Sequence, residues 1–414
     1  MKILHLLAQK PGETGSGVYL KNLVKVARSK EYAQYVIAGI DINDWHYLRS
    51  MPDDVLFAPV FFNTEELPFP VAGMSDAMPY TSTKYSEMTE EMFFLWQKAF
   101  TAALNKAALF EPDLIIVHHL WLLAALSRKV FPKTPIIGIC HSTEFRQLAS
   151  AGQFKEYVLN GCKQLDGIAA LSSYQKNEIQ RLYGIAGDKI KIVGGGFANE
   201  IFYPPQKRPI QDKIKLLYAG KISRVKGVLS LLRTFSQLPF PQEKVELILA
   251  GSGFGTEYDQ IMDMIKRMNN VTFLGSVSQT SLSNLMREAH IFVLPSFYEG
   301  FSLVTVEALA SGLRLVVNEL PVLREWISEE LEESGLVRFV KMPKLQAIDE
   351  PEPKELPAYE YRLRESIIYQ VNEVKKSKIV PLLGWQKMVY KYSWEAIFSK
   401  IENIYRSLSI HKKI

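Results

Sequence analysis

Cysteine is scarce in this chain of 414 residues, which contains only Cys140 and Cys162. Both stand in apolar surroundings, so we interpret them as small buried side chains and exclude a disulfide framework. Such sparing use of cysteine is typical of a reducing compartment. Low-complexity tracts and short repeats are missing as well, which excludes solenoids and repeat arrays.

A long hydrophobic run is also missing. The longest apolar stretch, residues 114–127, contains two histidines and is shorter than the roughly 20 residues that span a bilayer. The opening residues, MKILHLLAQK, turn polar at Gln9 and show no signal-peptide cleavage pattern. Together these features predict a cytoplasmic protein.

Charge of one sign is not in large excess. The chain has 49 Lys and Arg against 44 Asp and Glu, for a formal net charge of +5. That balance suits anionic substrates such as phosphates and excludes a typical nucleic-acid binder. Lys21, Lys25 and Arg28 share one face of an expected helix, which we interpret as a solvated face. The alternative is peripheral contact with anionic lipid at the inner membrane face.

The length predicts two domains, because one core rarely exceeds about 250–300 residues. Short apolar runs alternate with amphipathic stretches, which indicates an α/β fold class with two Rossmann-like, doubly wound domains. We expect strands at residues 3–8, 35–40, 113–119, 135–141, 167–172 and 189–196, and then at 215–220, 245–251, 271–275, 291–296 and 313–318. The proline-rich segment 201–209 predicts a linker, with domains at 1–203 and 204–392 that face an interdomain cleft.

Three further stretches complete the predicted organisation. Residues 61–85 break the α/β rhythm and predict a long loop, which either shapes an acceptor site or forms a packed lid. A helix is expected at about 88–109. Residues 343–357 are rich in proline and acid and predict an exposed connection.

The motif SFYEGFSLVTVEALASG, residues 296–312, is the most informative segment. A strand ends at Ser296, and a helix is expected from about Ser302 to Ser311. Its first backbone amides lack partners and the helix dipole is positive there, so a diphosphate is a fitting ligand. Glu299 precedes this helix and Glu307 lies on it, where a carboxylate can accept hydrogen bonds from a ribose diol. Taken alone, the pair would be better read as two surface carboxylates.

Three cations follow the strand in LLYAGKISRVKGV, at Lys221, Arg224 and Lys226. At the carboxyl end of a strand they would neutralise a leaving diphosphate. An ordinary basic turn is an equally good interpretation of the segment by itself.

The N-terminal segment has a loop with Gly12, Gly15, Ser16 and Gly17, which lets a ligand approach the backbone closely. It matches neither GxGxxG nor GxxxxGK[ST], so a structural turn is the stronger interpretation.

Histidines end two consecutive expected strands, as His118 and His119 and then as His141. We interpret His118 as a buried, satisfied side chain and keep a functional interpretation for His119 and His141. No acidic or cysteine ligands with metal-site spacing accompany them, so we expect no metal.

These segments resemble a known family. EGFSLVTVEALASG resembles the Glu-x7-Glu signature of the retaining family-4 (group 1) glycosyltransferases of GT-B fold, and LLYAGKISRVKGV, VELILAGSG and IKIVGGGFANEIFYP resemble its neighbouring segments. The resemblance implies that a C-terminal helix, about 393–414, crosses back to the first domain.

The resemblance also implies residue roles. Glu299 would contact the donor sugar, Glu307 the ribose hydroxyls and His141 the reacting sugar. Lys226 and Lys221 would bind the diphosphate; Lys221 stands where the family has arginine and lacks its planar fork, for which Arg224 compensates. The remaining implied contacts are the backbone amides of Phe301, Ser302, Leu303 and Val304 at the diphosphate, Val277 near the base, and Gly15, Ser16 and Gly17 on the donor and acceptor side.

The implied activity is transfer of a hexose from a nucleoside-diphosphate sugar to a glycan, lipid-linked or small-molecule acceptor, with retention of the anomeric configuration. It needs no cofactor or metal and belongs with cell-surface polysaccharide biosynthesis. Two alternatives stay open. One is another GT-B enzyme, such as a sugar-nucleotide epimerase or a phosphorylase, and the other is a non-catalytic protein that binds nucleotide-sugars or glycans.

Overall fold

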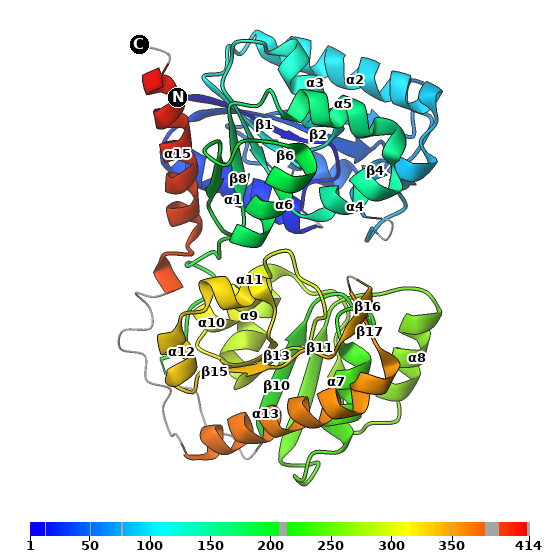
Figure 1. Cartoon of the computed structure of the whole chain (residues 1–414), viewed down its shortest axis with the longest axis vertical. Coiled ribbons are helices and arrows are strands. Elements are labelled where there is room, and N and C mark those ends of the chain that lie inside the picture. Colours follow the sequence, from blue (N-terminus) through cyan, green and yellow to red (C-terminus); the bar gives the residue numbers. More distant parts are fainter. Residues whose placement is uncertain are drawn as a thin grey trace. The chain divides into compact units, whose positions relative to one another are not determined.

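The structure, a computed structural model, describes residues 1–12, 14–49, 51–75, 78–206, 213–347, 349–376 and 389–411. The chain forms two compact units, Met1–Gly195 with Trp394–Ile414, and Gly196–Ser393 (Figure 1). The first unit thus ends at Gly195, whereas the sequence places the boundary after residue 203. Residues 207–209 of the expected linker lie outside the described residues.

The first unit is built on a parallel sheet that has seven strands within the described residues, in the order β3-β2-β1-β6-β7-β8-β9. The strands are β1 (Lys2–Leu7), β2 (Ala33–Asp41), β3 (Leu56–Phe62), β6 (Leu114–His118), β7 (Ile136–Ile139), β8 (Gly167–Ala170) and β9 (Ile190–Ile192). The central strands are buried apolar runs, as expected of a parallel sheet covered on both faces. The strand order reverses between β1 and β6, which makes their carboxyl ends the switch point where ligands bind in such folds.

Helices cover this sheet. They are α1 (Gly15–Ser29), α2 (Glu90–Ala108), α3 (Leu122–Val130), α4 (Thr143–Ser150), α5 (Lys155–Cys162) and α6 (Ser173–Tyr183), with short 3-10 turns η1 (Trp45–Arg49), η2 (Tyr85–Glu87) and η3 (Gly152–Phe154). The hydroxyls of Thr89 and Ser172 cap α2 and α6 by accepting backbone amides of the first turn. Cys140 and Cys162 are free and buried.

Helix α1 begins earlier than the sequence predicts, because hydrophobic periodicity indicates a helix only from about Val18 to Ser29. It starts at Gly15, with Thr14 as its N-cap accepting from the Gly17 amide, so Gly15, Ser16 and Gly17 form the first helical turn and not a loop. A Cβ added to Gly17 would lie 2.2 Å from the backbone nitrogen of Gly12. The glycines therefore let the start of the helix pack directly on the preceding turn.

The segment 61–85, which the sequence predicts to be a long loop, contains short strands in the structure. Its start belongs to β3, an edge strand that the sequence did not predict because only two of its seven residues are buried. A small parallel pair, β4 (Ala72–Gly73) and β5 (Thr83–Lys84), follows. Phe69, Met74 and Met78 are buried, which favours a packed segment, while residues 76–77 lie outside the described residues.

Helix α15 (Trp394–His411) belongs to the first unit and packs on α1 and β8 (red in Figure 1). The rings of Tyr19 and Trp394 meet edge to face with centroids 4.8 Å apart. The Tyr32 hydroxyl donates to Glu402 at 2.7 Å, and the Lys400 ammonium donates to the Val193 carbonyl at 2.9 Å. Residues 412–414 of the expected helix lie outside the described residues.

The second unit repeats the plan with a parallel sheet of six strands within the described residues, in the order β12-β11-β10-β13-β14-β15. Its strands are β10 (Ile214–Ala219), β11 (Val245–Ala250), β12 (Val271–Phe273), β13 (Ile291–Leu294), β14 (Arg314–Asn318) and β15 (Val337–Val340). The sequence did not predict the outermost strand, β15. The order reverses between β10 and β13, which again marks a switch point.

The helices of the second unit are α7 (Val228–Ser236), α8 (Thr256–Ile265), α9 (Gln279–Glu288), α10 (Leu303–Ala310), α11 (Pro321–Trp326), α12 (Glu329–Glu333) and α13 (Leu356–Lys376), with the 3-10 turn η4 (Pro353–Glu355). Helix α13 packs against α7, β14 and β15. The expected connection at 343–357 contains a small antiparallel hairpin, β16 (Leu345–Ala347) and β17 (Glu350–Pro351). Residue 348 lies outside the described residues.

Candidate active site

Lys226 and Glu299 meet at the switch point of the second unit. The Lys226 Nζ lies 2.9 Å from a carboxylate oxygen of Glu299 and also donates to the Tyr298 carbonyl at 3.2 Å. Their side chains are 25% and 12% exposed, so both charged groups are largely covered but keep some contact with solvent. The two residues lie after β10 and β13, the strands between which the sheet order reverses.

Helix α10 starts directly after this pair. Ser302 is its N-cap, with φ of 68°, and its hydroxyl contacts the Thr305 hydroxyl at 2.7 Å instead of capping a backbone amide. Phe301 and Ser302 are buried, whereas Leu303 and Val304 are partly exposed. No side chain among the described residues caps this helix start. The Thr305 amide donates to the Ser302 carbonyl at 3.1 Å, which leaves the Leu303 and Val304 amides and the positive end of the dipole available to an anion.

Glu307 occupies the fifth position of α10 and is only 6% exposed. Burial raises the pKa of its carboxyl to about 8. Ionisation there needs hydrogen-bond donors, which a ribose diol could supply. The two carboxylates of the motif therefore stand in different environments, Glu299 paired with a cation and Glu307 buried in an apolar helix.

The turn before α10 is held from two sides. The Asn318 amide donates to the carbonyls of Pro295 and Ser296 at 2.9 and 3.0 Å, and the Tyr359 hydroxyl contacts Asn318 at 2.8 Å. On the other side, Gly227 has φ of 70°, and a Cβ there would lie 2.0 Å from the Pro295 carbonyl oxygen. The segment after β10 and the segment after β13 thus pack backbone to backbone, which fixes Lys226 beside Glu299.

The other predicted donor contacts lie on the same carboxyl edge, in connections after β10 and β12. Lys221 is exposed, and its Nζ lies 4.9 Å from the centroid of the Phe254 ring. The Arg224 backbone amide donates to Glu257 at 3.2 Å. Val277 is half-buried just before α9. The structure brings Lys226, Glu299 and the start of α10 together.

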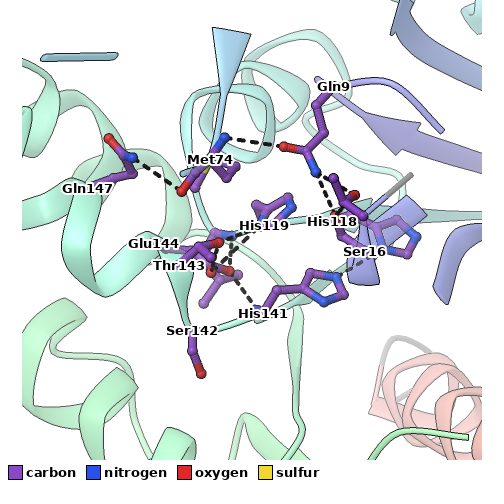
Figure 2. A network of polar contacts seen from close by, with 12 residues as sticks. Gln9, Ser16, Met74, His118, His119, His141, Ser142, Thr143, Glu144 and Gln147 are labelled. Carbon is purple, nitrogen blue, oxygen red and sulfur yellow. Dashed lines mark hydrogen bonds and ion pairs between the residues drawn. The ribbon is translucent and has the colours of Figure 1, made fainter. Parts of the chain in front are cut away.

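A polar network lies at the switch point of the first unit (Figure 2). The Gln9 amide donates to the hydroxyls of Thr14 and Ser16 at 2.9 and 2.7 Å, and its oxygen accepts from the Met74 amide at 3.2 Å. The Met74 carbonyl accepts from Gln147 on α4 at 3.2 Å. Ser16 is therefore part of a network that ties α1 to the 61–85 segment.

The histidines form a cluster in this same edge. His118 Nδ1 lies 3.1 Å from His141 Nε2, and the rings of His119 and His141 have centroids 4.7 Å apart. Tyr19 of α1 contacts the His141 ring edge to face at 5.4 Å. Burial is the main cause that lowers the pKa of His141 to about 3, and the nearby His119 lowers it further. Burial also lowers the pKa of His118 well below its usual value. Both rings are neutral at physiological pH.

Glu144 anchors this cluster through hydrogen bonds to the backbone and a contact with His119. Its Oε1 accepts the backbone amides of His141 and Leu120 at 2.9 and 3.1 Å, and its Oε2 lies 3.5 Å from His119 Nδ1. Burial raises the pKa of Glu144, but the proximity of His119, their hydrogen bond, His141 and a backbone hydrogen bond together lower it to about 2. The sequence alone did not indicate a role for Glu144. The spacing His141-x-x-Glu144, from a strand end into a helix start, was the available signal.

Two absences concern the described residues. Among them, no three His, Cys, Asp or Glu side chains are grouped so as to hold a metal ion. Within the same part of the chain, no helix combines the length and apolar character needed to cross a bilayer.

On the basic face of α1, Lys25 is exposed and Arg28 pairs with Asp54 at 2.8 Å.

Two family models match the chain in tandem. The model described as "Glycosyl transferases group 1" matches residues 200–344, and the model described as "Glycosyltransferase Family 4" matches residues 81–198. The chain belongs to the group 1 glycosyltransferases. The matched segments carry the Lys226, Glu299 and Glu307 site in the second unit and the histidine cluster in the first.

Curated relatives of this glycosyltransferase agree with that assignment. It is 25% identical over 292 residues to an uncharacterized glycosyltransferase of Methanocaldococcus jannaschii, covering 66% of this chain and 70% of the relative. It is 27% identical over 233 residues to the glycogen synthase of Mycobacterium tuberculosis, covering 52% and 54%. The match to alpha-maltose-1-phosphate synthase of Mycolicibacterium smegmatis is 21% identical over 336 residues, covering 75% and 83%. The chain thus spans about half the length of the glycogen synthase.

Solved structures establish the GT-B fold of this glycosyltransferase. The sucrose-phosphate synthase from Thermosynechococcus elongatus superposes with a TM-score of 0.70 at 18% identity, covering 99% of this chain and 100% of that one. Anabaena HepE in complex with UDP and glucose superposes with a TM-score of 0.69 at 16% identity, covering 98% and 100%.

Proposed function

We propose that this glycosyltransferase moves a hexose from a nucleoside-diphosphate sugar to a hydroxyl of a glycan, lipid-linked or small-molecule acceptor, with retention of configuration. The single observation that carries the proposal is the Lys226–Glu299 pair, 2.9 Å apart, at the uncapped start of α10. A cation and a helix N-terminus that converge on one point suit a diphosphate. A carboxylate beside them suits sugar hydroxyls.

Each residue then has one task. Lys226 and the first amides of α10 stabilise the charge that builds on the diphosphate as the bond from the anomeric carbon to oxygen breaks. Glu299 exchanges its ion pair with Lys226 for hydrogen bonds from the donor sugar. Glu307 accepts the ribose diol. His141, neutral and buried in the first unit, contacts the reacting sugar.

The retention proposal rests on which carboxylates are available. Glu299 is engaged by Lys226, and Glu307 lies buried within α10. Neither is set up as a covalent nucleophile, so we propose that the acceptor attacks from the face of the leaving group. The departing phosphate takes the acceptor proton.

The donor nucleotide can be identified by a thermal-shift screen of UDP, GDP and ADP, because a ligand that binds the folded state raises the apparent stability. Hydrolysis of the matching nucleotide sugar, followed by NMR of the released anomer, then tests turnover and stereochemistry together. We expect one nucleotide to raise the melting temperature and the first-formed product to keep the donor's configuration. Binding without any turnover would instead favour a non-catalytic nucleotide-sugar-binding protein.

A further inference from the structure

His119 is a buried side chain with an unused polar atom. It is 4% exposed, and its Nε2 has no hydrogen-bond partner among the described residues. Leaving a buried polar group unsatisfied is costly, so one at a ligand-binding edge points to a missing partner. Its backbone is also strained, with φ of 69°, although its amide is held by the Ile139 carbonyl at 2.9 Å. Strain of this kind concentrates at functional sites.

The surroundings of the other ring nitrogen determine where the imidazole proton sits. The Thr143 hydroxyl lies 3.3 Å from both His119 Nδ1 and Glu144 Oε2. A carboxylate can only accept, so Thr143 gives its proton to Glu144 and offers its oxygen to Nδ1. Glu144 Oε2 itself lies 3.5 Å from Nδ1 and also only accepts. Nδ1 must therefore carry a proton, and in the form of the ring with a single proton the lone pair is on Nε2.

A second unsatisfied acceptor lies on the same edge. Gln147 uses its amide nitrogen to bond the Met74 carbonyl, while its Oε1 is buried without a partner among the described residues. At His119, the buried Nε2 acceptor calls for a ligand that brings a donor. The ionised Glu144, whose pKa is lowered to about 2, disfavours a phosphate or carboxylate ligand nearby. A neutral, polyhydroxylated ligand fits both conditions.

We propose that His119 Nε2 accepts a hydrogen bond from a sugar hydroxyl, with Glu144 as the positioning residue that fixes the imidazole tautomer. The hydroxyl belongs either to the acceptor or to the sugar of the donor. The assignment of the hydroxyl to acceptor or donor rests on the function proposed above. Sugar binding at His119 does not depend on it.

His119→Asn is the informative variant. Asparagine tolerates the left-handed backbone and keeps a donor near Thr143, but it has no atom at the Nε2 position. His119→Gln reaches further and restores an acceptor there. Binding of glucose, galactose, mannose and N-acetylglucosamine to the full chain is followed by saturation-transfer NMR at pH 8. We expect about ten-fold weaker binding in His119→Asn and recovery in His119→Gln. His46→Asn, at an exposed histidine of the same unit, is the matched control.

Glu144→Gln tests the positioning role. Its amide would donate to Nδ1 and move the ring proton to Nε2, which nitrogen-15 NMR of the imidazole detects. Sugar binding should weaken as in His119→Asn, yet Glu144→Gln should have no further effect in a His119→Gln background. Equal sugar binding by wild type and His119→Asn, or no sugar binding by the wild type, would overturn the proposal.

Donor hydrolysis without acceptor separates the two sources of the hydroxyl. With UDP-glucose, a slower hydrolysis in His119→Asn assigns the hydroxyl to the donor sugar, and an unchanged hydrolysis assigns it to the acceptor. If no nucleotide sugar is turned over but monosaccharide binding still depends on His119, the proposed function fails and this inference stands.

Discussion

At the switch point of the first unit the polar side chains are buried and satisfy mostly one another, whereas at that of the second unit a cation and a carboxylate lie near solvent. His141 and Glu144 are held by several internal hydrogen bonds, while Lys226 and Glu299 mainly hold each other. The same doubly wound plan therefore supports a preformed, internally hydrogen-bonded network in one unit and an exchangeable ion pair in the other. A neutral sugar suits the first and a diphosphate the second.

The comparison predicts that the largest loss of activity comes from the exchangeable charge. Lys226→Ala should lower kcat by about 10²- to 10³-fold, because it removes a cation from the developing charge of the leaving group. Its melting temperature should change little, since the pair is partly exposed. Lys215→Ala, whose partner Glu288 lies at 2.9 Å on the surface, is the control. Unchanged turnover of the folded Lys226→Ala protein would remove Lys226 from the mechanism.

The backbone contact that places Lys226 gives the largest expected loss of stability. Gly227→Ala combines φ of 70° with a Cβ only 2.0 Å from the Pro295 oxygen, and it should destabilise the second unit by about 3 kcal/mol or more. Gly255→Ala has a similar φ of 84° but no atom within 4 Å, so about 1 kcal/mol is expected there. Urea denaturation measures the difference. Equal losses would mean that the close approach in the structure is not maintained.

The two units should respond to pH in opposite directions. Burial lowers the pKa of His5 to about 4 and, with the nearby His119, that of His141 to about 3. The folded first unit binds fewer protons than the unfolded chain, so its stability falls as the pH drops below about 6.5. Burial raises the pKa of Glu307 to about 8, so its contribution to the second unit falls as the pH rises from about 4.5 to 8.

Hydrogen exchange at pH 5.5 and pH 8 resolves the two units separately. We expect the backbone amides of the first unit to be better protected from exchange at pH 8. Those of the second unit should be better protected at pH 5.5, where Glu307 contributes more stability. His5→Gln should reduce the pH dependence of the stability of the first unit, and Glu307→Gln should reduce that of the second unit. Parallel responses that neither variant alters would contradict these pKa assignments.

The smallest expected effect concerns nucleotide binding. If the ribose diol donates to ionised Glu307, binding must release a proton below the pKa of about 8, and affinity should rise with pH up to that value. Calorimetry with the nucleoside diphosphate in buffers of different ionisation enthalpy measures this release. Glu307→Gln should bind about ten-fold more weakly and without proton release. A proton release that persists in Glu307→Gln would place the titrating group elsewhere.

Hydrophobic periodicity and continuous apolar runs in the sequence predicted most of this fold. The central strands are continuous apolar runs, so they were readable, and the GT-B assignment is confirmed. The edge strands β3 and β15 were missed because edge strands mix exposed and buried residues. The start of α1 was placed three residues late because glycines at 15 and 17 disfavour a helix by propensity, while the Thr14 cap and close packing override it.

The site was predictable where it follows a motif. The segment around Glu299 and Glu307 and the cation at Lys226 stand out in the sequence because they surround a strand end and a helix start. The roles assigned to these residues stay predictions. The Glu144–His119 pair could not be predicted, because it joins α4 to the end of β6 through a tertiary contact. The same holds for the Asn318 and Tyr359 side chains that support the turn before α10.

The return of α15 to the first unit has a consequence for biosynthesis. A ribosome completes the whole of Gly196–Ser393 before it makes the helix that covers Tyr19 and pairs with Tyr32. The second unit is continuous in sequence and can fold as it emerges, although it is translated later than most of the first. The first unit must wait with an uncovered apolar flank. In the nascent protein the second unit is therefore expected to mature before the first, and the first unit is the one that a chaperone would shield.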